Sequence, residues 1–188
     1  MSDYLVRGKR QDEKDWVEGY YCKLGPCGQE LPHIIPTYAS AFYGIEIDPS
    51  TVGQYTGTQI PERQVTDKNA YLKMKRVWQD DLIAIYSIGY DGDDNPARTH
   101  VATVRVQFDD NYKMLFAECV KGSMRDIAYE CNINYLEDED YPFTYWLEYM
   151  ENGSGQFWEW EIIGNIHDNP ELIGGGAVME GDSHEQKS

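Results

Sequence analysis

Short β-prone segments follow one another along most of the chain, and this pattern restricts the fold more than any other feature. Each segment is rich in Val, Ile, Tyr, Trp or Thr and ends at Gly, Pro, Asp or Asn, at spacings of about 10–15 residues. Residues 101–108 show the pattern most clearly, because Ala102, Val104 and Val106 alternate with more polar positions. We therefore predict a mainly β protein built as a small antiparallel barrel or sandwich, with few short helices.

Two further segments carry strong strand signals. Residues 82–88 form a continuous apolar run, which is typical of a central strand. Near the end of the chain, Trp158, Trp160 and Ile162 alternate with two glutamates, which predicts a last strand with one face in water.

The secondary structure of several other segments stays open. Residues 33–37, flanked by two prolines, suit an edge strand or an extended loop. Residues 69–77 can form a short helix or an extended arm. Residues 126–131 can form a short helix, and residues 133–136 a strand.

Charge is distributed very unevenly. The 188 residues carry 16 Lys and Arg against 33 Asp and Glu, a net charge of −17. Residues 1–76 hold ten acidic and ten basic residues, whereas residues 77–188 hold 23 acidic and six basic. The acidic part argues against a nucleic-acid partner or an anionic membrane surface, since both need clustered cations.

The sequence also lacks the usual signals for export or membrane insertion. The longest apolar run is about half of the roughly 18 residues that a membrane helix needs. The N-terminus is charged and has no apolar core of a signal peptide, so we expect a cytoplasmic protein without a membrane partner. The four cysteines are accordingly expected to be reduced thiols.

We predict no metal, no cofactor and no catalytic residues. Cys22 and Cys27 lack zinc-knuckle spacing, although a metal there stays open, as it does for the acidic run at residues 137–140. A calcium-loop spacing at residues 91–95 fails because Pro96 and Ala102 stand where glycine and glutamate are needed. Phosphate-loop, dinucleotide, nucleophile-elbow and zinc-protease motifs do not occur, so an enzyme is not favoured.

Two clusters suit an interaction surface instead. The cationic cluster lies in residues 63–76 and can bind an acidic partner. It can equally pair with the acidic part of this chain or of a neighbouring subunit. The aromatic one lies in residues 141–160 and suits a core or a protein interface, because residues 126–186 contain no Lys or Arg to meet phosphates. The candidate residues are Arg63, Lys68, Lys73, Lys75, Arg76, Tyr145, Trp146 and Trp158.

Three segments together resemble the YopX family of phage and prophage proteins. Residues 7–21, with Arg-Gly-Lys-Arg followed by Trp-Val-Glu-Gly-Tyr-Tyr, resemble the opening of that family. Residues 48–57, Asp-Pro-Ser-Thr-Val-Gly-Gln-Tyr-Thr-Gly, resemble its central motif, and residues 162–172 resemble its closing motif. The chain departs from the family at residues 59–76, which are longer and different, and at about 119–155, which is also longer.

The resemblance implies a mostly β fold with a small SH3-like barrel, a phage or prophage origin and a bacterial host cytoplasm. It supplies no activity and no site residue. We divide the chain accordingly into an N-terminal β region with a charged connector that packs on the barrel (1–76), an SH3-like barrel core with an insertion at about 119–155 (77–173), and a disordered C-terminal tail (174–188).

Within the motifs we expect elements that specify the fold. Gly53 and Gly57 suit a turn or bulge, Gly164 with Asn165 suits a bulge in the last strand, and the Asn-Pro pair at 169–170 stops that strand.

The leading functional hypothesis is a non-enzymatic phage accessory protein, a binding or assembly module that forms a homo-oligomer or binds a phage or host protein. The alternative is an acidic DNA mimic that inhibits a host nucleic-acid enzyme. A direct nucleic-acid binder and a cryptic enzyme come last.

Overall fold

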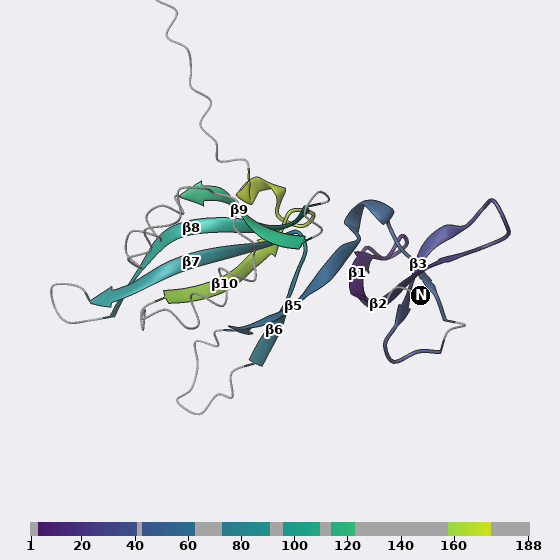
Figure 1. The fold of residues 1–188 in the computed structure, drawn as a ribbon, viewed down its shortest axis with the longest axis horizontal. Helices are drawn as coiled ribbons and strands as arrows, with labels where there is room; N and C mark the ends of the chain where they lie inside the picture. Colours follow the sequence, from purple (N-terminus) through teal and green to yellow (C-terminus); the bar gives the residue numbers. More distant parts are fainter. Residues whose placement is uncertain are drawn as a thin grey trace, which may run out of the picture.

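The chain folds into two curled antiparallel sheets that lie side by side (Figure 1). The computed structural model describes residues 4–40, 43–62, 73–90, 96–109, 114–122 and 158–173. Strands dominate these ranges, so the mainly β, antiparallel prediction is confirmed. The elements are β1 (Leu5–Lys9), β2 (Trp16–Leu24), β3 (Leu31–Pro36), β4 (Ile45–Glu46), η1 (Pro49–Thr51), β5 (Gly53–Glu62), β6 (Lys73–Trp78), β7 (Asp81–Tyr90), β8 (Pro96–Asp109), β9 (Met114–Gly122), β10 (Trp158–Asn165) and η2 (Pro170–Leu172).

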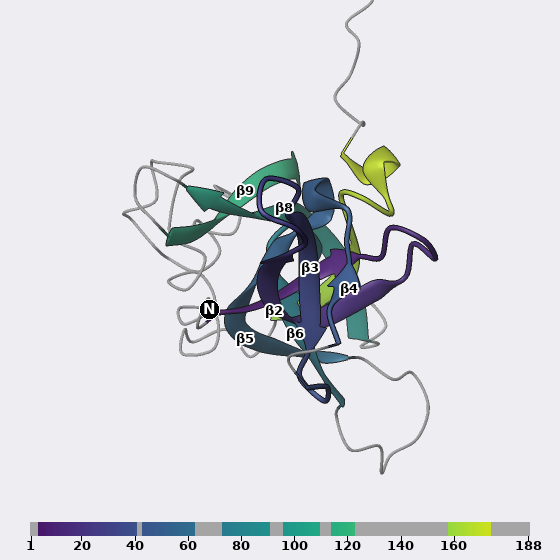
Figure 2. The ribbon, with the colours of Figure 1, turned by 90° about the vertical axis from the view of Figure 1, so that its right-hand side faces the viewer.

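The first sheet has the strand order β4-β3-β2-β1-β5-β6. Figure 2 looks at it from the side of β3 and β4. The pairing of β1 with β2 sets Arg7 opposite Glu18 and Lys9 opposite Trp16, so these four side chains share one face of the sheet. Residues 31–36 are not an edge strand, because β4 pairs with β3 on the side away from β2.

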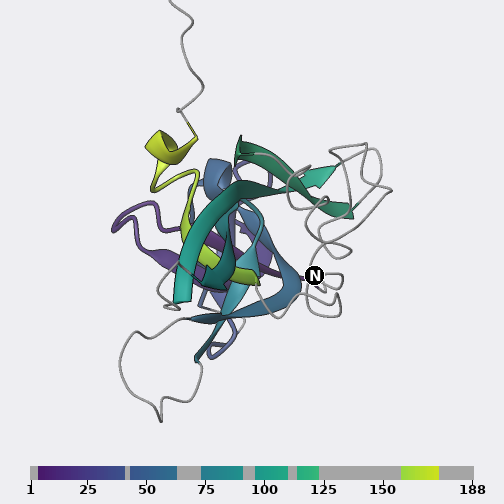
Figure 3. The same ribbon diagram turned by 90° about the vertical axis from the view of Figure 1, so that its left-hand side faces the viewer.

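The second sheet has the strand order β10-β7-β8-β9 (Figure 3). Strand β7 lies between β10 and β8 and is fully buried from Asp81 to Ile85, which confirms the predicted central strand. In β8 the alternating residues Ala102, Val104 and Val106 are buried as predicted.

Strand β5 belongs to both halves of the molecule. Its first residues pair with β1 and its last residues pair with β6. The register shifts between Tyr55 and Gln59, and Gly57 there adopts a φ of +86°. The predicted bulge at Gly57 is confirmed, whereas Gly53 lies in the strand, where a Cβ atom would meet the backbone of Gln79 at 2.9 Å.

The described residues form two apolar cores. The larger one joins β5 and β6 to the second sheet, and its buried residues are Ile60, Val77, Ile83, Ile85, Ala102, Val104, Val106 and Ala117. The smaller one lies under the first sheet, where its buried residues are Val6, Ile34 and Ile47. The undecided segment 69–77 contributes a strand from Lys73 onward.

The last strand ends as predicted. Its register shifts between Ile162 and Gly164, and η2 begins at Pro170. Residues 126–131 and 133–136, most of the insertion and the tail 174–188 lie outside the described residues. Within the ranges given above, no helix has the length and apolar character needed to cross a bilayer.

Candidate functional site

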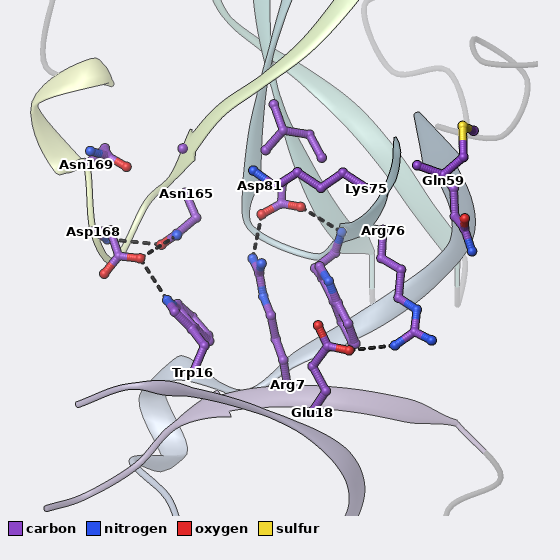
Figure 4. A pocket seen from close by; sticks show the side chains of 14 residues that line it. Arg7, Trp16, Glu18, Gln59, Lys75, Arg76, Asp81, Asn165, Asp168 and Asn169 are labelled. Atoms are coloured by element: carbon purple, nitrogen blue, oxygen red, sulfur yellow. Dashed lines mark hydrogen bonds and ion pairs between the residues drawn. The ribbon is translucent and has the colours of Figure 1, made fainter. Parts of the chain in front are cut away.

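A cleft of about 730 Å³ lies where the two sheets meet (Figure 4). Strands β1 and β2 of the first sheet lie on one side, the end of β10 on a second, and the β5–β6 hairpin on a third. The volume lies in the range of ligand-binding pockets. Its lining combines two tryptophans with charged and amide side chains, so it can contact both apolar and polar groups.

A buried ion pair closes the inner end of this cleft. The Arg7 guanidinium donates to Asp81 Oδ1 at 2.6 Å, and the two side chains are only 11% and 2% exposed. The other oxygen, Oδ2, accepts the backbone N–H of Trp78 at 2.8 Å. Burial raises the pKa of Asp81, and the nearby Arg7 and the Trp78 N–H oppose that rise. The pair therefore ties β1 of the first sheet to β7 of the second.

Cationic and aromatic side chains stack in a continuous row beside this ion pair. The Arg7 guanidinium lies 4.5 Å from the ring centre of Trp16 and 5.5 Å from that of Trp78. Trp78 packs on Tyr55 with ring centres 5.3 Å apart, and the guanidinium of Arg76 lies 5.7 Å from the Tyr55 ring centre. We call these five residues the stacked row. Each cation over a ring contributes about 0.5–2 kcal/mol, depending on how far it is desolvated.

A second polar cluster lies at the η2 side of the cleft. The Trp16 indole N–H and the Asn165 amide each donate to Asp168 Oδ2 at 2.7 Å, and Lys9 forms an ion pair with the same carboxylate. Burial alone raises the pKa of Asp168, but the hydrogen bonds from Lys9, Asn165 and Trp16 outweigh it and hold the pKa at about 2. Asp168 thus fastens the end of the second sheet to β1 and β2.

The turn between β6 and β7 sends neighbouring carboxylates in different directions. Asp80 has a φ of +69° and accepts two hydrogen bonds from Arg105, at 3.0 and 2.6 Å. His167 Nε2 lies 3.7 Å from the second oxygen of Asp80. Asp80 therefore serves contacts within the second sheet, while Asp81 faces the cleft.

Strand β6 forms the most open wall of the cleft. The Arg76 guanidinium lies 2.5 Å from Glu18 of β2, and both side chains are 44% exposed. Met74 is 48% exposed, and Lys75 is exposed and forms no ion pair with any residue in the described part of the chain. Figure 4 shows the Lys75 side chain reaching toward Asp81.

The structure brings some of the predicted interaction residues to this cleft. Lys75 and Arg76 line it, and Arg76 pairs with Glu18 of the charge-neutral first part rather than with the acidic second part. Lys73 and Trp158 are described by their backbones only, in β6 and β10. The remaining four lie outside the described residues: Arg63, Lys68, Tyr145 and Trp146.

The most engaged cleft residues were not among the predicted interaction residues. Arg7 and Asp81 are 74 positions apart, and Trp16 and Asp168 are 152 apart, so no local spacing connects them. One signal was present, because residues 7–21, 48–57 and 162–172 all reach this region: Arg7, Trp16, Tyr55 and Asp168 come from these segments.

No metal centre emerges from the described residues. Within them, no three His, Cys, Asp or Glu side chains gather closely enough to hold a metal ion. Cys22 and Cys27 are both free thiols, with Cys27 exposed in a turn, and the acidic run at 137–140 lies outside the described ranges.

Comparison of the chain with family models, curated proteins and solved structures finds no match. The resemblance to the YopX family therefore rests on the three sequence segments alone, and it stays a prediction.

Proposed function

We propose that the protein is a non-enzymatic binding or assembly module and that the cleft between its sheets is the binding surface. One observation supports this most directly: each carboxylate and each guanidinium of the cleft lining already has an ion-pair partner. Arg7 pairs with Asp81, Arg76 with Glu18, and Asp168 with Lys9. Side chains engaged in this way hold a surface in shape, whereas acid–base catalysis needs a group positioned to exchange a proton.

The open side chains of the cleft suit contact with another molecule. Exposed Met74 and Lys75 line the cleft together with Trp16 and Trp78. Met, Trp and Arg are enriched at protein interfaces, and the lining of the cleft includes Met74, Trp16 and Arg76. We propose a second copy of the chain, or a phage or host protein, as the partner.

We also propose that β5 to β10 form an SH3-like half-barrel decorated by β1 to β4 and by the insertion. The shared apolar core of the β5–β6 hairpin and the second sheet supports this arrangement. The three family-like segments support a phage or prophage origin. A gene neighbourhood of phage genes would agree with that origin, and a chromosomal setting without them would oppose it.

The binding proposal can be tested with a pair of bulky substitutions. Asn169→Trp places a large side chain in the cleft from the wall opposite β6, and Glu171→Trp places the same side chain on an exposed position nearby. The full chain and both variants are compared by size-exclusion chromatography with light scattering, at low and high salt, and by capture of partners from bacterial lysate.

We expect an oligomer or a captured partner that Asn169→Trp removes and Glu171→Trp retains. A monomer at every salt concentration, with no captured partner that distinguishes the two variants, would contradict the proposal.

The DNA-mimic hypothesis remains the second candidate because the whole −17 charge belongs to residues 77–188. A DNA mimic needs carboxylates in a free, continuous array. The described carboxylates of this part are largely paired: Asp80 and Glu118 with Arg105, Asp81 with Arg7, Asp168 with Lys9, and Glu159 and Glu161 with Arg98. An inhibition assay on host nucleases and restriction enzymes tests this function, and full enzyme activity at saturating protein would exclude it.

A further inference from the structure

We propose that the cleft accepts an extended peptide segment of a partner protein, which adds as a strand to the outer edge of β6 and places a carboxylate side chain against Lys75. This inference rests on the proposed binding function and specifies the chemistry of the partner.

The backbone of β6 shows which groups point outward. Strand β6 is the last strand in the order of the first sheet, and β5 pairs with one side of it. The Gln79 N–H donates to the carbonyl of Gln54 at 2.9 Å, so Gln79 faces β5. Backbone groups alternate along an antiparallel ladder, and the bulge at Gly57 adds residues to β5 only. The N–H and C=O groups of Met74, Arg76 and Trp78 therefore point away from β5.

The Trp78 N–H confirms this direction. It donates to Asp81 Oδ2, so the carboxylate occupies the place that a neighbouring strand would take at this end of β6. Farther along the same edge, Arg76 and Met74 line the cleft, and no strand in the described part of the chain pairs with them. An unpaired strand edge of this kind is a template for strand addition by a peptide.

Charge selects the kind of peptide. Together with Lys9, which pairs with Asp168 from outside the lining, the cleft region has one more cation than carboxylates. Lys75 is the cation that forms no ion pair in the described part of the chain, and its charge acts on the nearby Asp81. The numerous acids elsewhere in the chain act weakly here, since charges more than about 8 Å apart in water are largely screened at physiological ionic strength. A carboxylate side chain is the complement of Lys75.

The apolar side chains of the cleft indicate that the other residues of the peptide are apolar. Met74 and Trp78 of β6 line the cleft, and so does Ile162 of β10. Because side chains alternate along a strand, a peptide on β6 can direct apolar residues to these side chains and a carboxylate to Lys75. A nucleic acid has no backbone amides to pair with a strand edge, so we favour a peptide.

Synthetic peptides of about seven residues, the length of a short strand, test this inference on the full chain. They alternate Thr and Val around a central Glu, Gln or Lys. Binding is measured by tryptophan fluorescence, and its position by hydrogen exchange. We expect the Glu peptide to bind about fivefold more tightly than the Gln peptide, the contribution of one exposed ion pair, and to protect the amides of residues 73–78.

Four variants locate the contact. Lys75→Gln should remove the preference for Glu, and Lys75→Glu should transfer it to the Lys peptide. Met74→Pro removes one outward N–H and should abolish binding, whereas Lys23→Gln, which removes an exposed cation of β2, should change nothing. Thermal unfolding checks that Met74→Pro is folded. If it is not, Lys75→Glu with the Lys peptide tests the inference instead.

Equal affinity for the three peptides, absence of protection in β6, or a preference for single-stranded DNA over all peptides would overturn the inference. A partner or oligomer that is lost in Asn169→Trp but leaves β6 unprotected would refute strand addition and retain the proposed binding function. Dimers that protect β6 without any peptide would assign the edge to a second copy instead.

Discussion

The two apolar cores of the molecule differ in size, and the difference shows how each half is held together. Among the described residues, eight buried side chains join the β5–β6 hairpin to the second sheet, whereas three lie under the first sheet. Apolar burial stabilises a fold roughly in proportion to the area removed from water. The second half can thus depend on its own core, while the first half gains much of its stability from contacts with the second.

Those contacts are polar and aromatic rather than aliphatic. The Arg7–Asp81 pair connects β1 to β7, and the Asp168 cluster connects β1 and β2 to the end of β10 and the turn after it. The stacked row connects β1 and β2 to β5 and β6. This comparison predicts that changes at the junction affect the first sheet most, and that changes in the large core affect the whole molecule.

The largest effect is expected from Asp81→Asn. It leaves the Arg7 guanidinium buried without its counter-charge, so we expect a loss of about 4 kcal/mol in the free energy of unfolding, measured with urea. Asp12→Asn is the matched control, because the Arg10–Asp12 pair leaves Asp12 66% exposed to water, which screens the charges, so we expect little change in the free energy of unfolding. Equal losses in the two variants would show that burial of the pair does not matter.

The two cores can be compared directly with Ile85→Ala and Ile34→Ala, since both side chains are fully buried. Each substitution should cost about 3 kcal/mol within the element that it supports. Hydrogen exchange should show that Ile85→Ala lowers the protection of both sheets and that Ile34→Ala lowers only that of β1 to β4. The reverse pattern would mean that the first sheet organises the second.

Strand β5 connects the two halves, and Gly57→Ala tests its bend. Gly57 has a positive φ and no atom within 4 Å of an added Cβ, so the cost is conformational and should be about 1.5 kcal/mol. Gly89→Ala is the control, because Gly89 lies in β7 with equally open space and without a positive φ. Thermal unfolding compares the two variants: the midpoint of Gly57→Ala should fall, and that of Gly89→Ala should stay unchanged or rise. A neutral Gly57→Ala would indicate that the bend does not depend on this residue.

The smallest effect concerns the pH dependence of the Asp168 cluster. The pKa of Asp168 is lowered from 3.8 to about 2, so its contribution to stability is fully present above about pH 4 and is lost as the pH falls toward 2. Because Asp168 is 39% exposed, we expect less than about 1 kcal/mol. Urea unfolding at several pH values between 2 and 6 should show this loss in the native chain and not in Asp168→Asn. Parallel curves for the two proteins would exclude the contribution.

Much of the fold was predictable where apolar residues follow a regular period. The run at 82–88, the alternation at 101–108 and the Trp-rich end at 158–162 each produced the expected strand. Strand β6 could not be assigned in advance, because Lys-Met-Lys-Arg carries no such period and its conformation is set by pairing with β5.

The candidate site was less predictable for the same physical reason. Lys75 and Arg76 could be predicted as interaction residues, because neighbouring positive charges can be recognised in the sequence itself. Arg7, Trp16, Asp81 and Asp168 come together only through the tertiary fold, and each of them alone is an ordinary residue type in a strand or turn. Only the ordered set of family-like segments indicated that distant positions belong together.

The position of β1 has a consequence for the order in which the molecule can be completed during synthesis. β1 leaves the ribosome before the other described strands, yet it lies between β2 and β5 in its sheet. Asp81, the partner of Arg7, is synthesised 74 residues after it. Asp168, the partner of Trp16 in β2, is synthesised 152 residues after Trp16. A nascent chain thus keeps the first sheet loosely held until β10 has emerged, and the cleft is completed as one of the last events in folding.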